Sequence, residues 1–215
     1  MKAIARMGWI LGRMRSEATR RHAPVLTAEA LTAETPFSIL VFTLLSARTK
    51  DETTMKAVGR LFRIAKTPEE IAALGQTRLE KILYGVGFHR VKAKHLIHTC
   101  AILQKNGNRV PNTIDSLLLL PGVGRKTANI VLARAFNRNT LGVDVHVHRI
   151  SNRLGLVKTK KPEETERALV RSIQPSYIRR LNRDFVAFGQ TVCLPRNPRC
   201  AECPIRNLCP RIGVK

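Results

Sequence analysis

LLPGVGRKTANIVL, residues 119–132, lies in the middle of a strongly basic chain and contains the turn that best indicates its architecture. An apolar segment ends at Leu120, the sequence PGVG (121–124) follows, and apolar periodicity resumes over about 125–136. Glycine permits a positive φ angle and the close approach of another backbone. The pattern therefore predicts two helices joined by a tight hairpin, with Lys126 on the first turn of the second helix.

This hairpin also predicts an anion site. The N–H groups of the turn and of the new helix's N-terminus have no partner within the helix, and together they suit a phosphate. We expect Gly122, Val123, Gly124 and Arg125 to contact DNA through its backbone, which positions the duplex without reading its sequence. A plain tight turn between two packed helices is the alternative.

The charge of the chain supports a polyanionic partner. Its 215 residues include 38 Lys+Arg against 15 Asp+Glu, a net charge of +23. Nucleic acid is the commonest partner of such a protein; the alternatives are the ribosome, an anionic membrane surface, or a basic composition without function. The cations form no long run, so we assign them to a folded surface. No apolar run approaches the roughly 18 residues of a membrane span, and no membrane partner is expected.

The basic N-terminal segment MKAIARMGWILGRMRS (1–16) has two interpretations. It resembles an organellar transit peptide in composition. However, Ile4, Met7, Leu11 and Met14 recur at helical spacing, so we favour an amphipathic helix docked on the fold. Because no secretory signal is visible, we expect a cytoplasmic, nucleoid-associated protein whose cysteines are poor candidates for disulfides.

Helical periodicity dominates the rest of the chain, and the predicted class is all-α. Thr67 begins a capping box with a proline after it. Only GVDVHVHRI (142–150) alternates like a strand, and since a lone strand has no partner we expect a helix to start there. The other predicted helices are 36–48 (buried all round), 91–108, 113–120, 161–174 and 178–193.

The C-terminal tail predicts a metal centre. Cys193, Cys200, Cys203 and Cys209 follow the spacing C-x6-C-x2-C-x5-C, in a proline-rich segment with too few apolar residues for a core. Zinc and a [4Fe–4S] cluster both fit four thiolates at this spacing. Zinc ribbons usually have two C-x2-C pairs and this chain has one, which favours iron–sulfur. Cys100, in an apolar helix, is expected in the core.

Three features, taken in order, make the chain resemble the endonuclease III family of helix-hairpin-helix DNA glycosylases. They are LPGVGRKTANIVL, Asp144 eighteen residues after Lys126, and the cysteine tail. The resemblance covers about 36–209, roughly four-fifths of the chain. It implies two helical lobes flanking a DNA-binding cleft. A six-helix lobe with the hairpin would span 26–138, and a second lobe would combine 1–25 with 139–215 and hold a [4Fe–4S] cluster.

The resemblance also implies a reaction. Lys126 matches the family's nucleophile and Asp144 its catalytic aspartate. An amine attacks only when neutral, and the neighbouring Arg125 and the positive end of a helix favour the neutral form. The implied protein is a monomeric, bifunctional DNA glycosylase and AP lyase that removes oxidised pyrimidines from double-stranded DNA. Asp144 is equally suited to cap the helix that follows it.

Two further positions match residues that fill the gap left by a flipped nucleotide in relatives. They are Arg48, where the family commonly has glutamine, and Phe88, which core packing would also explain. His89 stands where a tyrosine is frequent, and both departures concern the substrate range. His146 and His148 have ligand-like spacing without an acidic cluster, so we expect structural or DNA-contacting roles.

Four alternative functions compete with this interpretation. Mismatch thymine or uracil glycosylases typically carry tyrosine at the lysine position. Adenine glycosylases carry serine there and add a large C-terminal domain, whereas this chain ends six residues after Cys209. A non-catalytic helix-hairpin-helix protein needs neither Lys126 nor Asp144. A small electron carrier rarely has a charge of +23.

Overall fold

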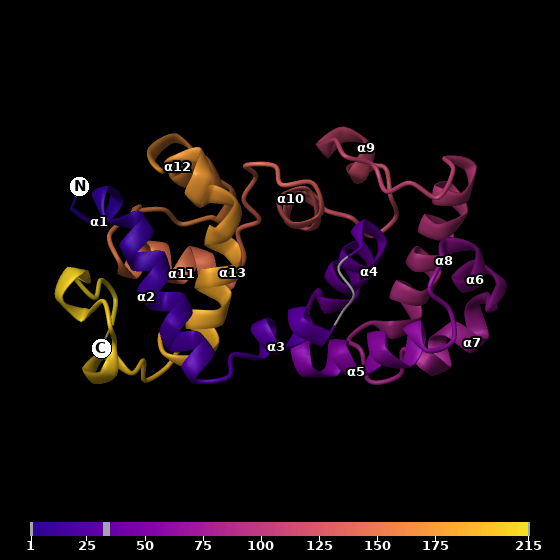
Figure 1. Ribbon diagram of the computed structural model, residues 1–215, viewed down its shortest axis with the longest axis horizontal. Coiled ribbons are helices and arrows are strands. Elements are labelled where there is room, and N and C mark those ends of the chain that lie inside the picture. The colour runs from indigo at the N-terminus through magenta and orange to yellow at the C-terminus, as the bar shows by residue number, and fades with distance from the viewer. Residues whose placement is uncertain (1, 32–34, 215) are drawn as a thin grey trace. The chain divides into compact units, whose positions relative to one another are not determined.

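The computed structural model describes residues 2–31 and 35–214, shown as a ribbon in Figure 1. The described residues form thirteen α-helices and two short 3₁₀ helices, without a β-strand, which confirms the all-α prediction. They fall into two compact units. One, the hairpin unit, runs from Ala28 to Phe136; the other, the cysteine unit, combines the residues up to Thr27 with those from Asn137 onward. These limits lie two residues from the lobe boundaries expected from the sequence.

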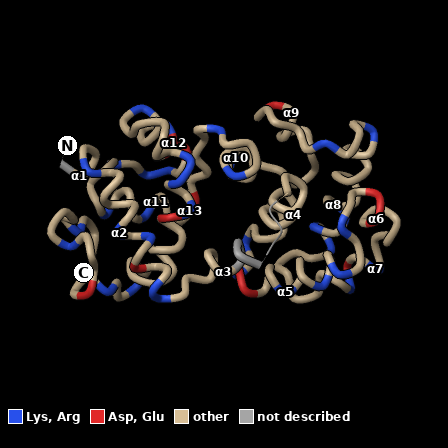
Figure 2. Tube along the Cα trace, in the orientation of Figure 1, with Lys and Arg blue, Asp and Glu red and all other residues tan. Residues whose placement is uncertain are grey.

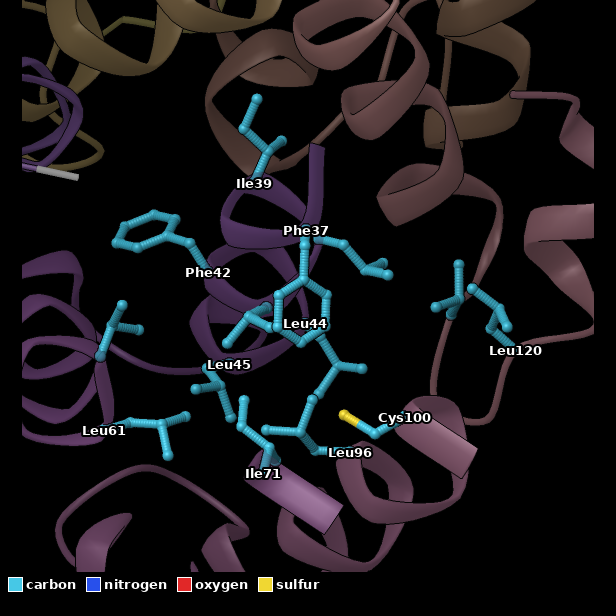
Figure 3. Close-up of a cluster of buried hydrophobic side chains, with 14 of the residues drawn as sticks. Phe37, Ile39, Phe42, Leu44, Leu45, Leu61, Ile71, Leu96, Cys100 and Leu120 are labelled. Atoms are coloured by element: carbon cyan, nitrogen blue, oxygen red, sulfur yellow. The ribbon is translucent and has the colours of Figure 1, made fainter. Parts of the chain in front are cut away.

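The hairpin unit is built around one buried helix. Its helices are α4 (Pro36–Ser46), α5 (Asp51–Phe62), α6 (Pro68–Ala73), α7 (Gly75–Ile82), α8 (His89–Lys105), α9 (Ile114–Leu118) and α10 (Arg125–Ala135). Every residue of α4 from Phe37 to Leu45 is buried, and the helix packs against α5, α8 and α10. Figure 3 shows its apolar side chains beside Leu96 and Cys100 of α8. The predictions of a central helix and of a core cysteine are confirmed; burial raises the pKa of Cys100 to about 12.

Caps explain where several of these helices begin. The Thr67 side chain accepts from the Glu70 N–H, and the Glu70 carboxylate accepts from the Thr67 N–H, so the predicted capping box is confirmed. A second box, not predicted, starts α4: Thr35 pairs reciprocally with Ser38 around Pro36 at the first helical position. Serine satisfies the same orphan N–H groups that the usual glutamate would reach.

The cysteine unit packs its N-terminal helix against its last long helix. It contains α1 (Lys2–Ala5), α2 (Met7–Arg20), the start of α3 (Pro24–Leu31), α11 (Val145–Arg153), α12 (Pro162–Ser172), α13 (Pro175–Thr191), η1 (Cys200–Glu202) and η2 (Arg206–Leu208). Met7, Leu11 and Met14 are buried in one apolar cluster with Phe185 and Phe188 of α13. The docked amphipathic helix is thus confirmed, with a break at Arg6; Met1, its expected first residue, lies outside the described residues.

Several predicted helix limits were wrong by a few residues. The helix predicted over 113–120 ends at Leu118, and the one predicted from 91 begins at His89. The last helix starts at Pro175 instead of 178, because proline suits the first helical turn. The segment 142–150 is helical from Val145, as expected. Figure 2 shows Lys and Arg spread along both units.

Candidate active site and metal centre

The hairpin between α9 and α10 is held against α8 by a close contact at Gly122. Its φ angle is +79°, and a Cβ at this position would lie 2.6 Å from Nδ1 of His95 on α8. The Thr99 hydroxyl donates to the Pro121 carbonyl at 3.3 Å, and Val123 is buried in the core. Any larger residue at Gly122 would meet both a strained backbone and a steric clash.

Lys126 is exposed on the first turn of α10. The next residues, Thr127 and Ala128, are buried, and the Ala128 N–H donates to the Gly124 carbonyl at 2.9 Å. Gly124 occupies the N-cap position and offers no side chain to cap the helix. Among the described residues, the Lys126 side chain has no hydrogen-bond or ion-pair partner. Its amine therefore stands at the positive end of the α10 dipole, open to solvent and to a ligand.

Asp144 is the N-cap of α11. Its Oδ1 accepts from the N–H groups of His146 and Val147, both at 2.9 Å. The side chain is half-buried, and within the described parts of the chain Oδ2 has no hydrogen-bond partner. One oxygen thus caps the helix while the other is available for chemistry. Lys126 and Asp144 belong to different compact units.

Arg48 and Phe88 lie together in the hairpin unit, although forty residues separate them in sequence. Both are exposed, and the Arg48 guanidinium carbon lies 5.7 Å from the centroid of the Phe88 ring. Both have positive φ angles, +53° and +58°. Phe88 is 61% exposed, which excludes the core-packing alternative for this residue.

The two histidines of α11 are structural within their unit. The His146 ring packs closely on the backbone of α13, where a Cβ at Gly189 would lie 2.4 Å from its Nδ1. The His148 ring shares a 2.7 Å hydrogen bond with Thr165 of α12. Both side chains therefore connect α11 to neighbouring helices.

All four tail cysteines line one pocket at the end of the cysteine unit. The rest of its wall combines apolar side chains, among them Ile150 of α11 and Phe188 of α13, with three arginines, Arg153, Arg199 and Arg211. Burial, together with the charge of the neighbouring cysteines, raises the pKa of the Cys203 thiol to about 11. Four half-buried thiolates would repel one another unless metal compensates their charge. No three His, Cys, Asp or Glu side chains in the described ranges converge as a single-ion site requires. A cubane cluster holds its four thiolates farther apart than a single ion does, because each thiolate binds its own iron.

Two arginines of α11, which the sequence did not single out, hold the start of the cysteine loop. Arg153 donates to the carbonyls of Leu194 and Pro195 at 2.6 and 2.8 Å. Arg149 donates to the Cys193 carbonyl at 2.8 Å. Sequence alone gave no signal for these bonds, since basic residues on this helix predict DNA contact equally well.

The fold and the cysteine loop define a class of protein. Residues 41–175 match the model of the HhH-GPD superfamily of base excision DNA repair proteins, and residues 193–209 match the iron–sulfur binding domain of endonuclease III. The chain is 47% identical over 175 residues to endonuclease III of Thermotoga maritima, covering 81% of this chain and 82% of that protein. It is 43% identical to endonuclease III-like protein 1 of Gallus gallus, covering 81% of this chain and 63% of the chicken protein.

Solved structures agree with the sequence relatives. A trapped endonuclease III–DNA covalent intermediate superposes with a TM-score of 0.82 at 32% identity, covering 96% of this chain and 95% of that one. The chain belongs to the endonuclease III family. It is a DNA-binding glycosylase and AP lyase of base excision repair, and it carries a [4Fe–4S] cluster. None of the described helices is long and apolar enough to cross a membrane.

Proposed function

We propose that this chain removes damaged bases from duplex DNA and cuts the strand at the resulting abasic site, with Lys126 as the nucleophile. The observation that carries the proposal is an exposed lysine, without a side-chain partner in the described ranges, on the first turn of the helix after the hairpin. The trapped covalent complex of a similar protein supports a covalent reaction.

The proposed chemistry proceeds in two steps. The neutral Lys126 amine attacks the sugar C1′, the bond from C1′ to the base breaks, and the base leaves with the electron pair. The amine then loses a proton, and its lone pair forms an iminium with C1′ as the bond from C1′ to the ring oxygen O4′ breaks and O4′ takes up a proton. The iminium acidifies the C2′ hydrogen, whose removal expels the 3′ phosphate by β-elimination. We assign to Asp144 the stabilisation of positive charge on the sugar and the transfer of these protons.

We propose three groups of DNA contacts. The backbone of Gly122, Val123 and Gly124, with Arg125, would bind phosphates at the α10 N-terminus. Arg48 and Phe88 would enter the duplex where the target nucleotide leaves the stack, because flipping requires that the gap be filled. The third group is the exposed arginines of the cysteine loop, Arg196, Arg199 and Arg206, which the [4Fe–4S] cluster on Cys193, Cys200, Cys203 and Cys209 would hold against the DNA backbone.

We further propose that the substrates are oxidised pyrimidines and abasic sites. The enzyme would act as a monomer near the nucleoid, and the two compact units would be its functional lobes. Removal of mismatched thymine or uracil, or of adenine, remains the alternative within the superfamily. Lys126 favours the lyase, because a tyrosine or serine in its place could not form a Schiff base.

The test separates binding from chemistry. Duplex DNA with one thymine glycol is incubated with wild type, Lys126→Ala and Lys126→Arg, and single-turnover excision and affinity are measured. Arginine keeps the positive charge that a phosphate contact needs but cannot form a Schiff base. We expect both variants to lose base excision and strand cleavage, with Lys126→Arg retaining wild-type affinity. If Lys126→Arg still excises and cleaves, the lysine is only a phosphate ligand.

A further inference from the structure

A buried lysine outside the proposed catalytic set supports the loop that carries Arg48. Lys92 of α8 is 7% exposed. Its Nζ donates to the carbonyls of Leu45 and Ala47 at 2.7 and 2.5 Å and to the Thr49 hydroxyl at 3.0 Å. The three donors of one ammonium thus meet three oxygens at the end of α4 and in the loop that follows it.

A second contact ties the loops to each other. The Thr49 hydroxyl also accepts from the Gly87 N–H at 3.1 Å, one residue before Phe88. A Cβ at Gly87 would lie 2.7 Å from the Arg48 carbonyl oxygen, so the two backbones touch. Thr49 therefore accepts from both Lys92 and Gly87 and links the loops through one oxygen.

The loops need such support because their conformation is unfavourable. Arg48 and Phe88 both adopt the left-handed region, where a Cβ approaches its own backbone too closely. A residue with a side chain stays in this region only where its surroundings hold it there. No other residue type offers three donors on one compact, flexible group, so lysine suits this position.

We propose that Lys92 is a positioning residue that fixes the Arg48 and Phe88 loops as one rigid element for insertion into DNA. The inference rests on the proposed role of these two residues at the flipped nucleotide. Lys92 lies beneath the loops and not at the reacting atoms, so it acts through Arg48 and Phe88. Burial lowers the pKa of Lys92 to about 8, which leaves the ammonium, with all three donors, the main form at pH 7.

The predicted consequence depends on the substrate. Excision from a duplex requires the loops to enter the stack, whereas a single-stranded abasic site has no stack to enter. Misplacement by about 1 Å can cost roughly 100-fold in rate. We therefore expect Lys92→Met, of similar volume, to slow excision of thymine glycol from duplex by about 10-fold or more, and cleavage of a single-stranded abasic site by less than about 3-fold.

The matched control is Lys94→Met, an exposed lysine on the same helix. Fluorescence of 2-aminopurine beside the lesion reports flipping directly, a signal that a general loss of stability would not change selectively. The 2-aminopurine fluorescence on binding should be lower for Lys92→Met than for wild type and unchanged for Lys94→Met. The inference would be overturned if both variants had the same ratio of the rate of duplex excision to the rate of single-strand cleavage.

A second pair of variants carries the same test if Lys92→Met fails to fold. Thr49→Val removes the shared hydroxyl and Thr49→Ser keeps it, so only the valine variant should show the duplex-selective loss. Equal ratios for this pair also overturn the proposal. Arg48→Ala and Phe88→Ala must themselves slow duplex excision; if they do not, the role of the loops falls and this inference with it. If Arg48→Ala and Phe88→Ala slow duplex excision while Lys92→Met and Thr49→Val match their controls, the loops keep their proposed role and only the role of Lys92 is overturned.

Discussion

At the scale of single residues, Asp144 combines a structural and a chemical contribution in one carboxylate. Its Oδ1 accepts two backbone N–H groups at the start of α11, and no described residue bonds its Oδ2. A substitution can therefore remove the charge while keeping the cap, because asparagine and aspartate are comparable N-caps.

We predict that Asp144→Asn keeps the free energy of unfolding within about 0.5 kcal/mol of wild type, whereas Asp144→Ala loses about 1 kcal/mol of cap stabilisation. Both variants should lose base excision, since neither has a carboxylate. Urea unfolding and single-turnover excision measure the two effects separately. An Asp144→Asn enzyme with full activity would refute the chemical role.

Gly122 and Gly124 make a matched pair for the hairpin. Alanine at Gly122 meets a φ of +79° and the His95 ring, whereas the space around Gly124 is open within 4 Å. We predict that Gly122→Ala costs about 1–3 kcal/mol and weakens DNA binding, while Gly124→Ala changes stability by less than about 1 kcal/mol. Thermal unfolding and fluorescence anisotropy with duplex DNA test this; equal effects from both variants would show that the close packing on α8 is unimportant.

At the scale of elements, local sequence predicted the helices that carry their own signals. The capping box of Thr67 with Pro68 and the apolar run of α4 both lie within the helix that they predict or directly before it. The first residues of α8 and α13 were missed because they are exposed or half-buried and lie outside the apolar pattern, although Pro175 suits a first helical turn. α5 and α7 were not singled out; α7 begins at a glycine with a φ of +70°, an unusual start.

The catalytic and metal-site predictions were residue types at fixed spacing, whereas the contacts that support them link distant segments. Lys92 reaches Leu45, and Arg153 reaches Pro195, across more than forty residues. Nothing in either local sequence distinguishes these cations from those on the solvated surface. Long-range hydrogen bonds of this kind were therefore beyond prediction from periodicity or spacing.

An ion-pair network fastens α2 to the cysteine loop and predicts acid sensitivity. Arg21 binds Glu17 at 2.6 Å and Glu202 of η1 at 2.5 Å. The Arg20 guanidinium, with Arg21, lowers the pKa of Glu17 to about 2. Because the folded pKa lies below the unfolded one, this stabilisation is present above about pH 4.5 and is lost as the pH falls towards 2.

We therefore expect the difference in melting temperature between wild type and Glu17→Gln to shrink between pH 6 and pH 3.5. The exposed Glu163→Gln serves as the control and should show no such trend. The contribution of Glu17 to the free energy of unfolding should stay below about 1 kcal/mol, since solvent screens the network. A difference that is constant over this range would mean that Glu17 does not stabilise the folded state through its charge.

At the scale of the whole molecule, the charge of +23 predicts how binding responds to salt. Each neutralised phosphate contributes about −0.9 to the slope of log affinity against log salt. If Arg196 and Arg199 contact phosphates, replacing both by glutamine should reduce the slope by about 2 without changing lesion preference. Arg13→Gln, where the arginine lies over Trp9, is the control. An unchanged slope would remove the cysteine loop from the DNA interface.

We assign the covalent bond to DNA to the Lys126 amine. The most direct measurement is borohydride reduction of the reaction with thymine glycol duplex, followed by proteolysis and mass mapping of the attached peptide. We expect a single adduct on Lys126, absent from Lys126→Arg, in agreement with this assignment. An adduct on another amine, or base excision with no adduct, would contradict it.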